Sequence, residues 1–195
     1  MKTISIALSF LFAVSTSLGA DSPVDLKVGD KAPEFSATAD DDTQWKSTSA
    51  VGKKILVVYF YPADMTGGCT KQACNYRDTM KDFTDKNVQV FGVSGDSAEN
   101  HRHFKQAHQL NFTLLADTEG KIAKAFGVQT GGGFTNTANI GGKEIRFPRT
   151  VTTSRWTFVI DTDWNIAYKN STVNPMADTA EVMKVVEKLA AVKPQ

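Results

Sequence analysis

A run of apolar residues at positions 54–61, KILVVYFY, constrains the fold of this chain more than any other stretch. After Lys54 every side chain of the run is β-branched, aliphatic or aromatic, so both faces are apolar. This is typical of a strand buried inside a parallel sheet. A parallel strand reaches its neighbour through a crossover connection that is usually a helix. The sequence supplies one, because apolar residues from Ala73 to Phe83 recur at spacings of three and four and predict a helix over residues 70–86.

The rest of the chain continues this alternation. Further strands are predicted at residues 43–46, 88–94, 112–115, 155–161 and 164–169, the last two as a hairpin. Further helices are predicted just before Gly52 and at residues 97–109, 118–126 and 176–192, with Ser97 as an N-cap. Residues 23–36 are expected to form an extended lead-in. This order predicts a single-domain α/β sandwich with a central mixed sheet, whose ligand site lies at the carboxyl ends of its parallel strands.

Residues 129–153 break the pattern, since they hold many threonines, three consecutive glycines at 131–133 and two more at 141–142. We expect a long surface loop or a loose hairpin, because strand-like sequence resumes afterwards. The triple glycine is not a phosphate-binding loop, since no Lys-Ser/Thr follows it. We interpret it as a flexible segment.

The first twenty residues have the features of a signal peptide. Lys2 is the positive residue, residues 4–14 are an apolar run, and small residues precede Asp21. The alternative is an uncleaved membrane anchor, but the run is short for a bilayer span of roughly 20 residues. We therefore expect cleavage of residues 1–20, export to the periplasm or the medium, and a mature domain of residues 21–195.

Charge and composition exclude some classes of function. The chain has 22 basic and 21 acidic residues, so loss of Lys2 with the signal peptide leaves 21 of each. Binding to nucleic acid or to an anionic membrane needs a basic surplus. With 41% hydrophobic residues among 195, the chain is long enough to bury a core without disulfide bonds.

Cys69 and Cys74 are the two cysteines of the chain. Two cysteines in an exported protein usually form one structural disulfide. If both lie in the predicted helix, however, five residues of helix separate their Cα atoms by ~8–9 Å, and a disulfide tolerates about 7 Å at most. Either the helix is intact and the thiols are free, or the disulfide forms and the first turns unwind. A redox cycle is therefore favoured, and a structural bridge requires a helix that begins later, near Ala73.

A thiol at the start of a helix suits such a cycle, because the helix dipole and the free backbone N–H groups stabilise a thiolate. A thiolate takes an oxygen atom from peroxide to become sulfenic acid, which then condenses with a second thiol. Fast cleavage of the O–O bond also needs hydrogen-bond donors where negative charge develops. The candidates are the Thr66 hydroxyl, the N–H groups of Gly68 and Cys69, and an arginine from another element.

These residues carry a family resemblance. The string PADMTGGC at positions 62–69 fits the P-x-x-x-T-x-x-C active-site motif of the peroxiredoxins. The longer string YFYPADMTGGCTKQACNYRD at positions 59–78 resembles the subfamily called bacterioferritin comigratory protein or peroxiredoxin Q, whose resolving cysteine lies five residues on in the same helix. The resemblance covers residues 28–189, approximately.

The resemblance implies a thioredoxin-like α/β/α sandwich and a peroxidase that reduces hydrogen peroxide and organic hydroperoxides. Cys69 looks like the peroxidatic cysteine and Cys74 the resolving cysteine. Thr66 would hydrogen-bond the thiolate and the peroxide, Pro62 would shield the pocket, and Arg155 would polarise the thiolate and the substrate. No metal or organic cofactor is implied. The expected partner is a thioredoxin-like reductant in the same compartment, and the expected assembly is a monomer or weak dimer.

The chain departs from the family pattern at two places. Gly67 stands where the family usually has a proline, which predicts a more mobile loop. The glycine-rich stretch before Arg155 is longer than in the family, so Arg149 is the second candidate for the active-site arginine.

Other interpretations have less support. His101, His103 and His108 lack further ligands at metal-binding spacing, and we interpret them as polar residues of a helix surface. An exported disulfide oxidoreductase of thioredoxin type is an alternative function, but that chemistry normally uses C-x-x-C, and this chain has C-x-x-x-x-C. A binding module with one structural disulfide is the non-enzymatic alternative.

Overall fold

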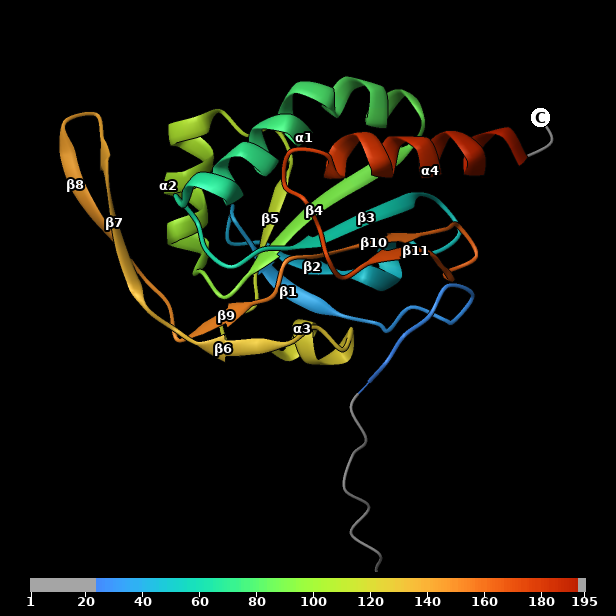
Figure 1. Cartoon of the computed structure of the whole chain (residues 1–195), viewed down its shortest axis with the longest axis horizontal. Coiled ribbons are helices and arrows are strands. Elements are labelled where there is room, and N and C mark those ends of the chain that lie inside the picture. Colours follow the sequence, from blue (N-terminus) through green and yellow to red (C-terminus); the bar gives the residue numbers. More distant parts are fainter. Residues whose placement is uncertain (1–23, 193–195) are drawn as a thin grey trace, which may run out of the picture.

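A computed structural model describes residues 24–192 of the chain. The predicted signal peptide therefore lies outside the described residues. A seven-stranded sheet in the order β11–β10–β3–β4–β5–β1–β2 forms the centre of the fold (Figure 1). Its strands are β1 (Ser36–Ala39), β2 (Gln44–Lys46), β3 (Ile55–Phe60), β4 (Val88–Ser94), β5 (Thr113–Ala116), β10 (Trp156–Ile160) and β11 (Ile166–Asn170). The helices are η1 (Ser47–Ser49), α1 (Gly67–Asp85), α2 (Ala98–His108), α3 (Lys121–Ala125) and α4 (Asp178–Val192).

Strands β3, β4 and β5 are parallel and occupy the middle of the sheet. The other strands pair antiparallel, β10 with β3, β11 with β10, β1 with β5 and β2 with β1. Strand β3 lies between β10 and β4, and all six of its residues are buried, as the apolar run predicts. The predicted α/β sandwich with a central mixed sheet is confirmed.

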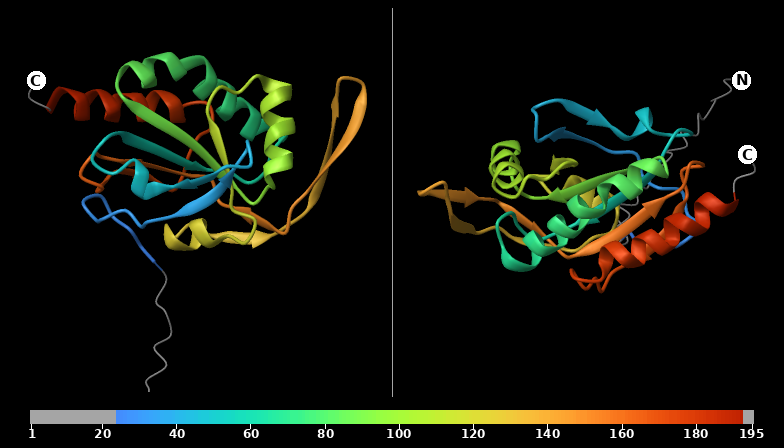
Figure 2. Two further views of the ribbon diagram at one scale, coloured as in Figure 1. Left: turned by 180° about the vertical axis from the view of Figure 1, so that it is seen from behind. Right: turned by 90° about the horizontal axis from the view of Figure 1, so that it is seen from above.

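The two faces of β3 contribute to two separate clusters of the core. Val57 and Tyr59 pack beneath α1, α2 and α4, whereas Val58 and Phe60 face α3 and the N-terminal segment. Figure 2 shows this layering, with α1, α2 and α4 on one side of the sheet and α3 on the other. The period of two along a strand thus distributes one apolar run between two helical layers.

Most predicted elements are present, with shifted ends. Helix α1 begins at Gly67, three residues before the predicted start, and the Ser97 hydroxyl caps α2 by accepting the N–H of Asn100, as predicted. Helix α3 is shorter than predicted. Strand β1 was not predicted, because its sequence SATA is short and has none of the large β-branched or aromatic residues that mark a strand.

Residues 129–153 form a hairpin rather than an open loop. Strands β7 (Thr135–Ile140) and β8 (Lys143–Pro148) pair antiparallel, and β6 (Thr130–Gly132) pairs with β9 (Val151–Thr153) at their base. We call residues 130–153 the ribbon; its β7–β8 end projects beside α2 (Figure 1). The interpretation of the triple glycine as merely flexible was wrong. A Cβ atom on Gly133 would lie 2.0 Å from the carbonyl oxygen of Arg149, so the two segments that join the strand pairs approach this closely only with glycine there.

None of the helices in the described part of the chain has the length and apolarity that a bilayer span requires.

Candidate active site

The site lies where β3 ends and α1 begins, at the carboxyl edge of the parallel strands. Side chains from elsewhere in the chain hold the backbone carbonyls of this segment. The Thr153 hydroxyl donates to the carbonyl of Tyr61 (2.9 Å), and the Asn136 amide donates to the carbonyl of Asp64 (3.1 Å). Met65 adopts a φ of 60°, in the left-handed region that non-glycine residues rarely occupy. Such a conformation costs about 1–3 kcal/mol and persists only where the surroundings fix it. The ribbon supplies both of these loop contacts, since Asn136 and Thr153 belong to it.

Helix α1 presents Cys69 in its first turn. Thr66 is the N-cap, and the first helical hydrogen bond runs from the N–H of Thr70 to the carbonyl of Thr66 (2.8 Å). The N–H groups of Gly67, Gly68 and Cys69 precede that bond, so they have no partner within the helix. Cys69 itself is 2% exposed. Its sulfur is nearly excluded from water, and the positive end of the helix dipole beside it favours negative charge.

Arg155 brings a permanent positive charge to this sulfur. It immediately precedes β10, and its Nη2 donates to Cys69 Sγ at 3.1 Å while its Nη1 donates to Gln72 Oε1. The guanidinium passes over Gly68, where a Cβ atom would lie 3.6 Å from Nη2. Cys69 and Arg155 are 86 residues apart in the sequence, and the antiparallel pairing of β10 with β3 brings them together.

The second candidate, Arg149, occupies a different place. Its guanidinium donates to Asp96 Oδ1 from Nε (3.0 Å) and Nη2 (2.8 Å) and to Asn136 Oδ1 (2.7 Å). It also stacks on Phe134, with Cζ 4.5 Å from the ring centroid. Arg149 therefore fixes the base of the ribbon, and the structure brings Arg155, not Arg149, to Cys69.

Thr66 and Pro62 border the same loop. The Thr66 hydroxyl donates to the carbonyl of Ala63 at 3.0 Å, so its one proton is directed away from Cys69 and its lone pairs stay available to a donor. Pro62 is half-buried at the start of the loop. The roles predicted for these two residues toward peroxide remain predictions.

Both cysteines are free and lie in one continuous helix. Cys69 is buried and Cys74 is half-buried. The helix begins well before Ala73, so the late start that a structural bridge would require is absent. The geometry is the one in which the two thiols are held apart, as predicted for a reduced protein with an intact helix.

The part of α1 beyond Cys74 is attached to the sheet and to the end of α2 by contacts of its own. Tyr76 stacks on Tyr59 with ring centroids 4.7 Å apart and planes at 14°, a contact worth about 0.5–1.5 kcal/mol beyond its burial. The Arg77 guanidinium donates to the carbonyl of His108 (2.7 Å), and the Asn111 amide donates to the carbonyl of Arg77 (3.2 Å). These contacts attach α1 to the sheet and to the end of α2.

A buried polar network beneath the loop was missed in the sequence. His101 was interpreted as a surface residue, and this was wrong: it is fully buried, and its Nδ1 lies 2.8 Å from Asp64 Oδ2. The Tyr61 hydroxyl donates to the other oxygen of Asp64 (2.7 Å). The carboxylate of Asp96 accepts the backbone N–H of Asp64 (2.9 Å) and pairs with Arg149. The network thus connects the loop before Cys69 to α2 and to the ribbon.

Burial shifts the titration of this network. It raises the pKa of Asp64 above its ordinary value, against the opposing charge and hydrogen bond of His101. Burial alone would lower the pKa of His101, but the charge and hydrogen bond of Asp64 outweigh it, and the pKa of His101 is raised. One signal could have revealed the network: an aspartate follows each of the parallel strands β3 and β4, at positions 64 and 96.

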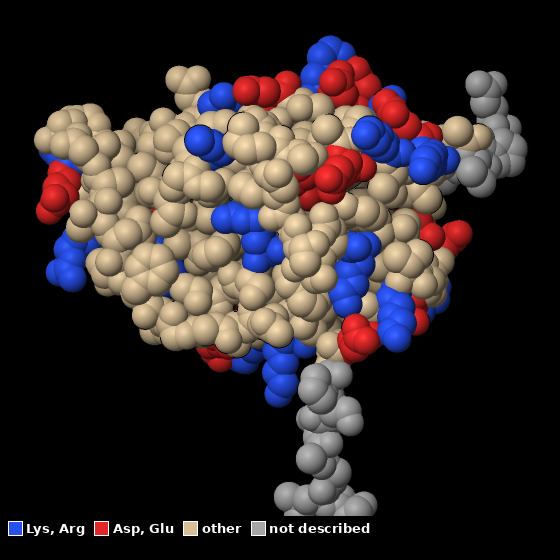
Figure 3. All heavy atoms as spheres, in the orientation of Figure 1, with Lys and Arg blue, Asp and Glu red and all other residues tan. Residues whose placement is uncertain are grey.

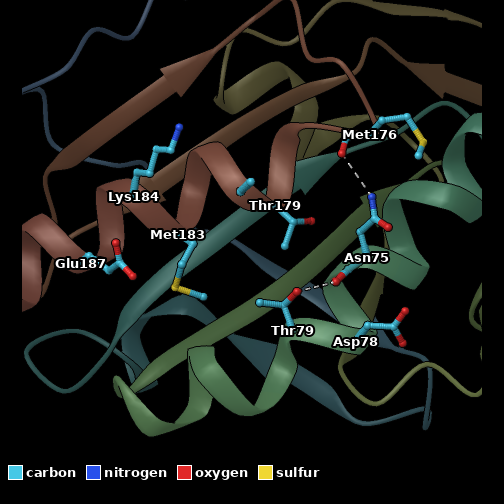
Figure 4. A pocket seen from close by; sticks show the side chains of 9 residues that line it. Asn75, Asp78, Thr79, Met176, Thr179, Met183, Lys184 and Glu187 are labelled. Atoms are coloured by element: carbon cyan, nitrogen blue, oxygen red, sulfur yellow. Dashed lines mark hydrogen bonds between the residues drawn. The ribbon is translucent and has the colours of Figure 1, made fainter.

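A groove of about 470 Å³ lies between α1 and α4 (Figure 4). Met176 and Met183 give it an apolar part, and Asp78, Lys184 and Glu187 surround that part with charge.

Within the described range, no group of three His, Cys, Asp or Glu side chains is placed to hold a metal ion. Acidic and basic side chains are interspersed on the face shown in Figure 3.

Comparison with known proteins agrees with this geometry. The chain matches the AhpC/TSA family over residues 28–169, a segment that contains both cysteines and Arg155. The chain belongs to the AhpC/TSA family. The resemblance predicted from the cysteine motif is thereby confirmed, and so is the enzyme class, a thiol peroxidase of the peroxiredoxin type.

Three relatives show how far the similarity extends. Peroxiredoxin Q, chloroplastic, of Oryza sativa subsp. japonica is 36% identical over 162 residues, 83% of this chain and 67% of that protein. Peroxiredoxin Bcp of Bacillus subtilis (strain 168) is 45% identical over 103 residues, 53% of this chain and 65% of that protein. The crystal structure of peroxidoxin BcpB from Mycobacterium tuberculosis superposes with a TM-score of 0.69 at 29% identity, covering 87% of this chain and 100% of the other.

Proposed function

We propose that this chain reduces hydrogen peroxide and organic hydroperoxides through Cys69, resolves the product with Cys74, and is reduced by a thioredoxin-like donor. One observation carries the proposal. The thiol of Cys69 lies at the N-terminus of α1, 3.1 Å from the guanidinium of Arg155, with a second free thiol five residues further along the same helix.

The first step is attack of the Cys69 thiolate on one peroxide oxygen. The O–O bond breaks, the sulfur becomes a sulfenic acid, and the leaving oxygen takes a proton and departs as water or an alcohol. Negative charge develops on the departing oxygen, and donors already directed at the site stabilise it. Those donors are the N–H groups of Gly68 and Cys69 and the guanidinium of Arg155. The hydroxyl of Thr66 can accept the hydrogen of the incoming peroxide.

The second step joins the two sulfurs. The thiol of Cys74 attacks the sulfenic sulfur, a disulfide forms and water leaves. Because the intact helix holds the Cα atoms ~8–9 Å apart, the first turns of α1 must unwind for this step. The third step is thiol–disulfide exchange, in which a dithiol donor becomes oxidised and both cysteines regain their protons. A donor with a thioredoxin-like dithiol in the same compartment supplies the electrons.

The first test counts thiols. Reduced protein mixed with one equivalent of peroxide should lose two thiols and consume the peroxide, and Cys69→Ser should abolish both changes. Cys74→Ser should lose one thiol and form a sulfenic acid that dimedone traps, and it should over-oxidise when excess peroxide is added. Retention of all thiols over minutes would contradict the proposal, as would consumption of peroxide by the Cys69→Ser protein.

We also propose export, on the strength of the first twenty residues alone. Mass spectrometry of the protein from the periplasm or the medium should give a chain that begins at or next to Asp21. Recovery of the full-length chain from the cytosol would contradict this proposal without affecting the peroxidase.

A further inference from the structure

The first residue of α4, Asp178, places a carboxyl group inside the protein and outside the motif. Its side chain is fully buried. One oxygen, Oδ2, accepts three hydrogen bonds: from Gln72 Nε2 (2.7 Å), from the Tyr76 hydroxyl (2.8 Å) and from the Thr157 hydroxyl (3.0 Å). Burial raises the pKa of Asp178, and its Oδ1 has no hydrogen-bond partner among residues 24–192, whereas the three donors on Oδ2 favour the ionised carboxylate. Gln72 and Tyr76 belong to α1, which also carries Cys69. Thr157 belongs to β10, which begins directly after Arg155.

Gln72 joins this carboxylate to the candidate active site. Its amide is fully buried and has two different ends, an NH₂ group that donates and an oxygen that accepts. A carboxylate only accepts, so Asp178 requires the NH₂ end, and the oxygen end is left to face Arg155. A guanidinium only donates, so this orientation satisfies it as well. The amide is thereby fixed at both ends.

Gln72 in turn restrains the guanidinium of Arg155. Nη1 is held by Gln72 Oε1, and the planar head consequently directs Nη2 at Cys69 Sγ, 3.1 Å away. Without the carboxylate, the buried amide would lose its partner on one side and would no longer be restricted to one position. Hydrogen bonds in such a buried chain also polarise one another, so ionisation of Asp178 strengthens the next two bonds.

From this arrangement we infer that Asp178 is a positioning residue, which acts through Gln72 to direct the guanidinium of Arg155 at the sulfur of Cys69. Its side-chain hydrogen bonds come from Gln72, Tyr76 and Thr157, and none involves the sulfur. The inference rests on the proposed function, because it concerns the rate at which Cys69 reacts with peroxide. It extends the site from the loop and α1 to the start of α4, 109 residues after Cys69.

The test is a double-mutant comparison of Asp178→Asn and Arg155→Lys. Asparagine keeps the shape of the side chain and an acceptor oxygen but removes the charge. The second-order rate constant for oxidation by peroxide, followed by stopped-flow tryptophan fluorescence, should fall about tenfold for Asp178→Asn in the otherwise wild-type chain. In the Arg155→Lys chain the same change should slow the reaction less than about twofold, because the group that it acts on is already gone.

Two further variants separate positioning from stability. Thr157→Val removes another donor to the same oxygen without touching Gln72, so it should lower the melting temperature while the peroxide rate stays within about twofold of wild type. Gln72→Met breaks the connection from its other end, and should reproduce the loss of rate even if the Asp178→Asn protein does not fold. Each variant is also alkylated with iodoacetamide in a Cys74→Ser background, where the rate of alkylation reports the Cys69 thiolate without peroxide.

The inference is overturned if Asp178→Asn slows the reaction equally with and without Arg155, or leaves it unchanged. It is also overturned if Thr157→Val slows the reaction as much as Asp178→Asn. Failure of the proposed function gives a different result, since the wild-type protein would then lose no thiols on addition of peroxide. The alkylation rates would still differ between the variants in that case.

Discussion

Replacing Gly67 with proline should make the Cys69–Cys74 disulfide easier to reduce. Gly67 is the first residue of α1, and a Cβ atom there would meet no atom within 4 Å. Its φ is not positive, and its N–H has no partner within the helix, so proline removes no helical hydrogen bond. The preceding residue, Thr66, has φ −96° and ψ 148°, the extended conformation that a following proline requires. The helical form therefore accepts the ring without strain.

The size of the effect follows from conformational entropy. Substitution of glycine by a more restricted residue at a compatible position stabilises the ordered form by about 0.4–1 kcal/mol, because the disordered form has fewer conformations. In the proposed cycle the start of α1 is ordered in the dithiol protein and unwound in the disulfide protein. The substitution thus favours the dithiol form, and for a two-electron couple, where 30 mV corresponds to about 1.4 kcal/mol, the reduction potential should rise by about 10–20 mV.

Equilibration in dithiothreitol redox buffers, followed by thiol quantification, measures this potential. Gly67→Ala should shift it in the same direction by a smaller amount, since alanine restricts the chain less than proline. Gly132→Ala is the matched control: a Cβ atom at that ribbon position also meets no atom within 4 Å, but the segment does not unwind. The Gly132→Ala potential should stay at the wild-type value. A fall in potential for Gly67→Pro, or an equal rise in the melting temperatures of both redox forms, would refute the reasoning.

Three other predictions follow from the described contacts. Arg155→Lys should slow oxidation by peroxide about 10–100-fold in stopped-flow assays, because a hydrogen bond to a charged group contributes about 1.5–3 kcal/mol; an unchanged rate would contradict the assigned contact. Since the pKa of His101 is raised above 6.5 in the folded protein, the folded state keeps a proton that the unfolded chain releases. The free energy of unfolding should therefore fall as the pH rises from 6.5 through the folded-state pKa of His101. Urea titrations should show a weaker pH dependence for His101→Gln than for the wild type, and the same pH dependence in both proteins would contradict the prediction. Arg149→Met should lower stability by about 3–5 kcal/mol, because it leaves the buried carboxylate of Asp96 without its cation; the exposed Arg146→Met is the control, and equal melting temperatures for the two would count against the buried pair.

The parts of the fold with strong local signals could be predicted from the sequence. The apolar run of β3 and the periodic pattern of α1 each depend on neighbouring residues alone, and both were found. Strand β1 was missed because its pairing with β5 is decided by the sheet and not by its own four small residues. The ribbon was left open between loop and hairpin, since its threonines and glycines carry little information on register.

The candidate site divides in the same way. Cys69, Cys74 and Thr66 lie within one short motif, so their proximity follows from local geometry. The burial of His101 depends on Asp64, 37 residues away, and the position of Asp178 depends on Gln72, 106 residues away. Neither contact leaves a local trace in the sequence, because each results from the order of strands in the sheet.

The firm attachment of α1 beyond Cys74 has a consequence for the kinetics of the proposed cycle. Starting a helix in free chain is slow and unfavourable, because several residues must be fixed before the first hydrogen bond forms. Tyr76 and Arg77 keep the later turns in place, so after reduction the unwound residues extend an existing helix and need no new nucleus. Extension takes on the order of nanoseconds per residue. Rewinding should therefore not limit turnover, which leaves the unwinding of the first turns and the encounters with peroxide and with the reductant as the slower events.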